Sequence, residues 1–247
     1  MMRISVWDRG LDDAYLRLVT QLGADAVDFG GDTAFPGVKE QGYPDLDEVL
    51  KMKKKVRSYG LDMNRVTLPN ITERFMGGAP DGDRDLENSV HALRVFAEAG
   101  IPLARQRFAG DVFNQLMTRY RAVHRGGYRS RGESLAPGDP ETPGREELDA
   151  WWARFVDVYS ALVPVAEDTG IKLALHPSDT PNPETPLGSL GYHRVIDAFP
   201  SRQVGYLYCC GTRAEAGGSS LVLDEINNYG RKGRIFMVHF RNVRGSL

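Results

Sequence analysis

The chain is poor in the features that mark secreted, membrane and nucleic-acid-binding proteins. Its 247 residues include only two cysteines, which are adjacent and offer no disulfide framework. No apolar run approaches the roughly 20 residues that span a bilayer, and the start of the sequence lacks a signal-peptide pattern. The net charge of −2 supplies no basic field for nucleic acid or an anionic membrane. We therefore expect a cytoplasmic protein with no nucleic-acid or membrane partner.

A dinucleotide-binding motif, G-x-G-x-x-G, is also absent after the first predicted strand. The sequence instead repeats short apolar strands, such as residues 3–7, and amphipathic helices, such as residues 145–169. This alternation predicts an α/β fold, a (β/α)8 TIM barrel, with residues 1–247 as a single domain. About seven strands are visible, so the pattern predicts that the C-terminal βα unit is missing. A partner chain could cover the strand edges that this exposes, so a homo-oligomer is one possible assembly.

Two segments have predicted structures that bear on the site. A long insertion at about 110–144 contains a candidate short helix at 111–123, followed by residues dense in Gly, Pro, Arg and Ser. Connections of this length are usually binding loops, lids or disordered pieces, so we interpret it as a lid, with a mobile surface insertion as the alternative. Further on, Ser219 or Ser220 is expected to begin the helix that follows the strand at 204–208.

Three residues of metal-binding type stand at the C-terminal ends of three successive predicted strands. They are His176, Cys209 and His239, separated by 33 and 30 residues, which is about one βα unit per step. In a barrel such strand ends converge on the catalytic face, and imidazole and thiolate groups bind divalent transition metals. Taken singly, each residue could be structural, but their common register favours a metal site. On alternation alone, Cys209 and the adjacent Cys210 point to opposite faces, which leaves the choice between them open.

Three motifs in the second half of the chain resemble one known family. L-A-L-H-P-S-D, Y-C-C-G-T-R-A-E and I-F-M-V-H-F-R-N-V-R-G are similar, in order and spacing, to motifs of the mannonate dehydratase family, which belongs to the xylose isomerase-like barrel superfamily. The resemblance implies dehydration of D-mannonate, or a related aldonic acid, to 2-keto-3-deoxy-D-gluconate in hexuronate catabolism. It implies Mn²⁺ or Fe²⁺ bound by His176, Cys209 and His239, with Cys209 favoured over Cys210. It also implies that Arg241 lies near a sugar-acid substrate.

The same resemblance implies a fourth metal ligand, an aspartate, and catalytic acid and base residues downstream of the last motif. No catalytic residue is therefore assigned within this chain. Two other functions stay open. One is a sugar isomerase or epimerase of the same superfamily, whose members usually use carboxylate ligands at strand ends. The other is a degenerate barrel that binds a sugar acid without turnover.

Overall fold

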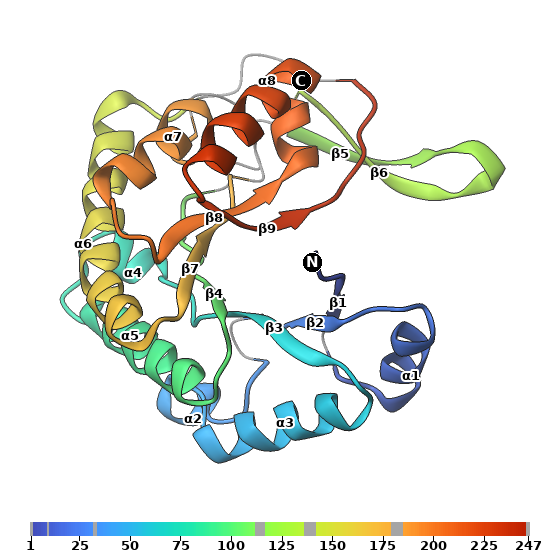
Figure 1. The fold of residues 1–247 in the computed structure, drawn as a ribbon. Coiled ribbons are helices and arrows are strands. Elements are labelled where there is room, and N and C mark those ends of the chain that lie inside the picture. Colours follow the sequence, from blue (N-terminus) through green and yellow to red (C-terminus); the bar gives the residue numbers. More distant parts are fainter. Residues whose placement is uncertain are drawn as a thin grey trace. The chain divides into compact units, whose positions relative to one another are not determined.

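The computed structural model describes residues 2–8, 10–31, 34–111, 117–135, 142–178 and 185–245. Within it the chain divides into two compact units, which we describe separately (Figure 1). The segments of the first unit are Met1–Ala109, Arg154–Leu175 and Phe199–Tyr206. Those of the second unit are Gly110–Ala153, His176–Ala198 and Leu207–Leu247.

The first unit is built on a parallel sheet. Its strands are hydrogen-bonded in the order β1-β2-β3-β4-β7-β8, and every one of these pairs is parallel. This confirms the predicted alternation of parallel strands with helices. The strands are β1 (Ser5–Asp8), β2 (Ala26–Phe29), β3 (Asp62–Thr67), β4 (Leu103–Arg105), β7 (Lys172–Leu175) and β8 (Val204–Cys209), of which residues 204–206 belong to this unit.

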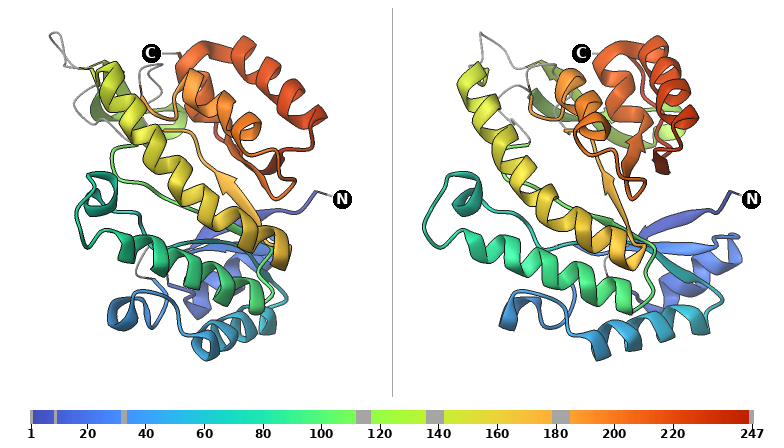
Figure 2. Two further views of the ribbon diagram at one scale, coloured as in Figure 1. Left: turned by 90° about the vertical axis from the view of Figure 1, so that its left-hand side faces the viewer. Right: turned by 60° about the vertical axis from the view of Figure 1, so that its left-hand side comes forward.

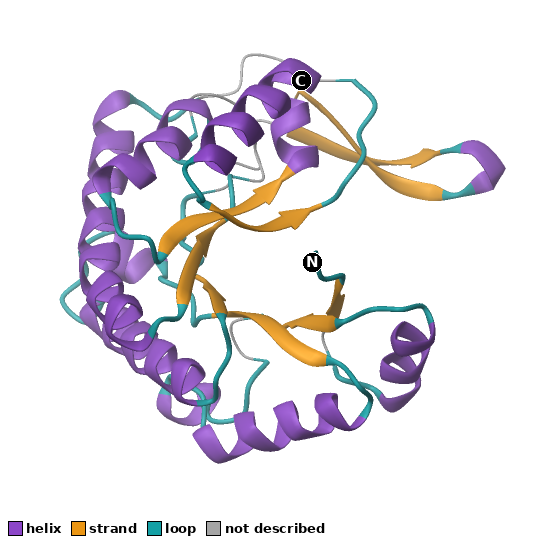
Figure 3. Ribbon diagram, in the orientation of Figure 1, coloured by secondary structure: helices purple, strands orange, loops and turns teal. Residues whose placement is uncertain are grey.

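Helices follow the strands of the first unit and pack on the same face of the sheet (Figure 3). Helix α5 and the C-terminal part of α6 run side by side in both views of Figure 2. The helices are α1 (Asp13–Gln21), α2 (Val38–Gln41), α3 (Leu46–Ser58), α4 (Glu73–Met76), α5 (Asp83–Glu98) and α6 (Arg145–Thr169), of which residues 154–169 belong to this unit.

Helix α3 shows how the local sequence determines these elements. Asp45 is the N-cap, and its side chain accepts a hydrogen bond from the backbone N–H of Glu48. Gly60, with φ of +79°, adopts the left-handed conformation that commonly ends a helix. Val49 and Val56 lie one above the other on the inward face and are fully buried. Burial of one such side chain contributes about 1.5–3 kcal/mol relative to leaving it in water.

The second unit carries the C-terminal ends of the last strands. Strand β9 neighbours β8 in the sheet order, and β8 contributes residues 207–209 to this unit. None of the helices in the described parts of the chain combines the length and apolar character needed to cross a membrane. The elements of the second unit are β5 (Met117–Val123), β6 (Arg129–Leu135), α7 (Ser189–Ala198), α8 (Cys210–Arg231), β9 (Ile235–His239) and the first nine residues of α6.

The insertion at 110–144 forms a β-hairpin in its described part, so the short helix predicted at 111–123 is wrong. Strands β5 and β6 pair antiparallel, from Met117 opposite Leu135 to Val123 opposite Arg129. Most of the hairpin is exposed, and its strands therefore lack the apolar alternation by which a half-buried strand is recognised in a sequence. Residues 112–116 and 136–141 of the insertion lie outside the described residues. Its role as a lid stays a prediction.

Helix α8 begins directly after β8, nine or ten residues before the predicted start at Ser219 or Ser220. It starts at Cys210, and its regular backbone is interrupted at Gly217 and Gly218. The prediction placed the start at Ser219 or Ser220 because serine is a favoured N-cap and two glycines usually break a helix. The early start places residues 210–216 in helical geometry beside the end of β8.

Candidate metal centre

His176 directly follows β7 and is almost fully buried, with 5% of its surface exposed. Its Nδ1 lies 2.6 Å from the carbonyl oxygen of Pro177. A carbonyl oxygen can only accept a hydrogen bond, so Nδ1 carries the proton and donates it. The other ring nitrogen, Nε2, then has the lone pair that can bind a metal. In metal-binding histidines the tautomer is commonly fixed in this way, by a hydrogen bond from the nitrogen that does not bind the metal.

Cys209 is the last residue of β8 and is 3% exposed. Burial opposes ionisation of its thiol, but a hydrogen bond from His239, hydrogen bonds from Thr212 and the charge of Arg241 outweigh it, and the pKa of Cys209 lies below its ordinary value. The hydroxyl of Thr212 donates to Sγ over 3.2 Å. The pKa of Cys210, by contrast, is raised by burial and by the neighbouring Cys209. Because the thiolate is the form that binds metals, Cys209 is the better ligand of the two.

His239 ends β9 and completes the cluster. Its ring centroid lies 5.2 Å from that of His176, and one ligand atom from each of His176, Cys209 and His239 lies within 4.8 Å of the others. The structure thus brings together the three residues that the sequence predicts as metal ligands. Among the described residues, no aspartate or glutamate belongs to this group.

The three donor atoms fit a divalent transition metal. Bonds from such an ion to imidazole nitrogen and thiolate sulfur are about 2.0–2.3 Å long, so at tetrahedral angles two ligand atoms of one ion lie about 3.3–3.6 Å apart. The three ligand atoms here lie within 4.8 Å of one another, so a closing movement of the side chains on the order of 1 Å is sufficient. Two imidazoles and one thiol of lowered pKa are also donors of the borderline-to-soft type that suits such ions.

Arg241 lies two residues beyond His239 and is oriented by helix α8. Its Nη2 forms an ion pair with Oε2 of Glu215 over 2.7 Å. Its guanidinium also packs directly on the backbone of Gly211, where the Cβ of any larger residue would overlap Nε and Cζ. Burial and the nearby carboxylate of Glu133 raise the pKa of Glu215, while Arg241 opposes this shift. The predicted substrate-binding arginine is thus about one-third exposed and charge-paired.

Glu215 and Gly211 are two residues beside Arg241 that the sequence did not single out. They are separated by four residues, so on a helix they lie on the same face, one turn apart. The signal was present in the motif C-C-G-T-R-A-E, but it becomes visible only if this segment is taken as helical. Asp179, the last residue of the first motif, lies outside the described residues.

A second charged cluster in the same unit is internal. Arg213 and Glu225, both in α8, are at most 1% exposed and form two contacts, of 2.9 Å from Nε and 2.6 Å from Nη2. The hydroxyl of Tyr208 donates to Glu225 over 2.9 Å, and Nε2 of His193 lies 3.4 Å from the same carboxylate. This network links α8 to β8 and α7, and its burial suits a structural role.

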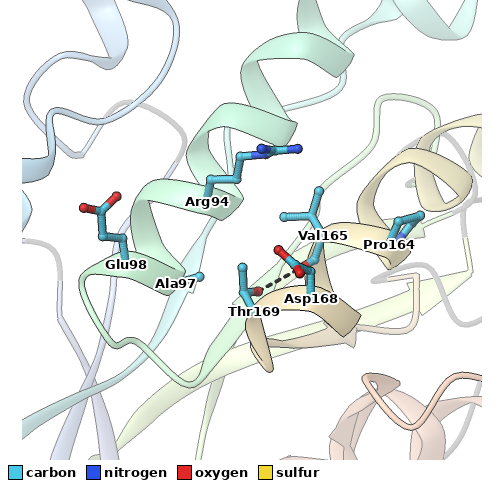
Figure 4. A pocket seen from close by; sticks show the side chains of 7 residues that line it. All are labelled: Arg94, Ala97, Glu98, Pro164, Val165, Asp168 and Thr169. Atoms are coloured by element: carbon cyan, nitrogen blue, oxygen red, sulfur yellow. Dashed lines mark hydrogen bonds between the residues drawn. The ribbon is translucent and has the colours of Figure 1, made fainter.

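A cavity of about 560 Å³ lies in the first unit, between helices α5 and α6 (Figure 4). Its polar lining consists of Arg94, Glu98, Asp168 and Thr169, and the hydroxyl of Thr169 donates to the carbonyl of Val165. These residues belong to the last turns of the two helices, which lead into the N-terminal ends of β4 and β7. Active sites of barrels lie at the opposite, C-terminal ends of the strands, so we assign this cavity no catalytic role.

Comparison with known proteins places the chain in a family. The profile of the xylose isomerase-like TIM barrel family matches residues 16–247. The chain belongs to this family. The predicted barrel class is thereby confirmed.

Individual relatives agree with the resemblance carried by the three motifs. "Mannonate dehydratase 2" of Halalkalibacterium halodurans is 25% identical over 230 residues, which cover 80% of this chain and 66% of the relative. A mannonate dehydratase of Streptococcus suis is 26% identical over 236 residues, which cover 82% and 63%. The chain thus spans slightly less than two-thirds of the length of these relatives.

Solved structures agree with the fold. The crystal structure of mannonate dehydratase from Streptococcus suis serotype 2 superimposes with a TM-score of 0.76 at 23% identity, over 98% of this chain and 74% of the other. The IolI protein, solved with a bound zinc atom, superimposes with a TM-score of 0.60 at 12% identity, over 96% and 72%.

Proposed function

We propose that this chain binds one divalent metal ion through His176, Cys209 and His239 and dehydrates a sugar acid. The convergence of these three ligand atoms within 4.8 Å is the observation that carries the proposal. The similarity to mannonate dehydratases over about 80% of the chain supports D-mannonate, or a related aldonic acid, as substrate and 2-keto-3-deoxy-D-gluconate as product. The resemblance of the three motifs to that family implies Mn²⁺ or Fe²⁺ as the bound ion, and we propose hexuronate catabolism in the cytoplasm as the setting.

The chemistry of dehydration requires groups that stabilise negative charge, which Arg241 and a bound metal ion would provide. The reaction removes the proton α to the carboxylate and the hydroxyl on the next carbon, and together these leave as water. Negative charge accumulates on the substrate carboxylate as the α proton departs. Arg241, about one-third exposed beside the cluster, supplies a cation for that carboxylate. A bound divalent ion would add Lewis-acid stabilisation of the same negative charge.

A sugar isomerase or epimerase is the second candidate function. Sugar phosphate isomerase/epimerase and D-psicose 3-epimerase structures share the fold, with TM-scores of 0.64 and 0.59 at 17% and 12% identity. The donor set favours the dehydratase, because the three strand ends of the cluster present two histidines and a cysteine in place of carboxylates.

The test is metal-dependent turnover. Purified protein is loaded with Mn²⁺ or Fe²⁺ and incubated with D-mannonate, and keto-acid formation is measured together with the bound metal. We expect product only with metal, and His239→Ala should lose both metal and product. His91→Ala, which alters an exposed histidine of α5 stacked on Tyr43, is the matched control and should lose neither. Unchanged metal content in His239→Ala would rule out the proposed centre. Stabilisation by D-mannonate without product would indicate a binding protein in place of an enzyme.

A further inference from the structure

Glu215 is the acidic partner of the arginine beside the metal cluster. It lies in the first segment of α8, four residues beyond Gly211, and its side chain is 15% exposed. Its Oε2 lies 2.7 Å from Nη2 of Arg241, whereas the group of potential metal ligands contains no atom of Glu215. Glu215 therefore contacts the arginine and not the cluster itself.

The guanidinium of Arg241 makes two contacts with one face of α8. It packs against Gly211, where a methyl group would collide with its Nε and Cζ. Its Nη2 meets Glu215, one turn further along the helix. Nε and Nη2 are both buried, so the exposed part of the side chain lies elsewhere. A long side chain with several rotatable bonds is thus held in one orientation by one charge contact and one backbone surface.

Charges of the hairpin restrict Glu215 in turn. Glu133 of β6 is 4% exposed and forms ion pairs of 3.1 Å with Arg119 and with Arg131, through the same carboxylate oxygen. Burial and the negative charge of Glu133 raise the pKa of Glu215, whereas the charges of Arg241 and Arg131 oppose this shift. The carboxylate of Glu215 is directed at Arg241, and rotation towards Glu133 would bring two carboxylates together.

We propose that Glu215 is a positioning residue that orients Arg241 for the carboxylate of the sugar acid, an inference that rests on the proposed function. Ordering an arginine side chain costs up to about 2 kcal/mol of conformational entropy. An arginine already ordered by Glu215 and Gly211 does not incur this cost when the acid binds, so binding is tighter. Glu215 acts only through Arg241 and makes no contact with the reacting atoms.

The experiment measures D-mannonate binding to the Mn²⁺-loaded protein by calorimetry. Glu215→Gln keeps the size of the side chain but removes its charge, and Gly211→Ala displaces the guanidinium while keeping Glu215. Both variants should bind D-mannonate about tenfold more weakly, because binding must then order the Arg241 side chain. Their Mn²⁺ affinity should stay within about twofold of the original. Asp224→Asn, an exposed carboxylate in the same helix, is the matched control and should change neither quantity.

A double-mutant cycle tests whether Glu215 acts through Arg241. Once Arg241→Gln has removed the cation, adding Glu215→Gln should cause no further loss of affinity. An additional tenfold loss would overturn the inference, as would unchanged or tighter binding in Glu215→Gln alone. Tighter binding would mean that Glu215 competes with the substrate for Arg241.

A crystal structure of Glu215→Gln separates this inference from the proposed function. Failure of the original protein to bind D-mannonate at all would contradict the proposed function. The position of Arg241 in the variant then decides the positioning role. A guanidinium that leaves Gly211 supports it, and one that stays in place overturns it.

Discussion

Two arginine–glutamate pairs, both involving helix α8, differ in how deeply they are buried and in how many contacts they make. Arg213 and Glu225 are almost fully buried, make two short contacts with each other, and are joined by Tyr208 and His193. Arg241 and Glu215 make one contact, and Arg241 is one-third exposed beside the metal cluster. A pair this deeply buried is out of reach of a ligand. The difference shows that burial and the number of partners, more than residue type, decide whether a charge can be reached from outside the protein, as the proposed binding role of Arg241 requires.

The largest expected effect is a loss of stability when the buried Arg213–Glu225 ion pair is broken. Glu225→Gln leaves the positive charge of Arg213 inside the protein without its carboxylate, and removal of one partner of a buried pair typically costs about 3–5 kcal/mol. Urea unfolding should show this loss in the free energy of unfolding. The matched change Glu215→Gln should cost much less, because this pair makes a single contact and the rest of the Arg241 side chain is about one-third exposed. Equal losses in the two variants would contradict the distinction between a structural and a binding pair.

The second expected effect concerns the candidate metal ligands beside the Arg241–Glu215 pair. Cys209→Ser should weaken Mn²⁺ binding by more than about 100-fold, because loss of a direct ligand should exceed the 10–100-fold typical of outer partners. Cys210→Ser is the control and should bind the ion normally, since Cys210 is not part of the ligand group. Calorimetric titration of the two variants measures the contrast. Loss of metal only in the Cys210 variant would reverse the ligand assignment.

The smallest expected effect is a pH dependence of stability that arises from His193, next to the buried pair. Burial lowers the pKa of His193 from its ordinary 6.5, Glu225 partly restores it, and Arg213 lowers it again. The folded protein therefore binds fewer protons here than the unfolded chain at mildly acidic pH. Stability from this group is fully present above pH 6.5 and is lost as the pH falls through the lowered pKa of the folded state.

His193→Gln tests this dependence, because it removes the titrating ring and keeps a polar side chain. The urea midpoint of the original protein should fall between pH 7.5 and 5.5, and the variant should show a shallower fall over the same interval. His124→Gln, at an exposed position in the hairpin, serves as the control and should keep the original slope. Identical slopes in the His193 variant and the original protein would contradict the assignment.

The described structure agrees with the sequence where local periodicity reports burial. Helix α6 spans residues 145–169 as predicted, because its apolar stripe recurs at helical spacing and its inner side chains, such as Phe155 and Leu162, are buried. The exposed strands of the hairpin carry no such stripe, and there the predicted helix is wrong. Periodicity thus identified elements that pack against the core and failed for those that do not.

By itself, the sequence determined the alternation of strands and helices and placed three metal-binding residue types one βα unit apart. Parallel strands end on the same side, so that spacing was sufficient to predict the convergence of His176, Cys209 and His239. Only the tertiary structure decided which charges meet. Helix α8 starts at Cys210, and this start brings Glu215 to Arg241, 26 positions away in the chain. Sequence patterns report which side of an element is buried, whereas ion pairs between distant segments depend on how those segments pack.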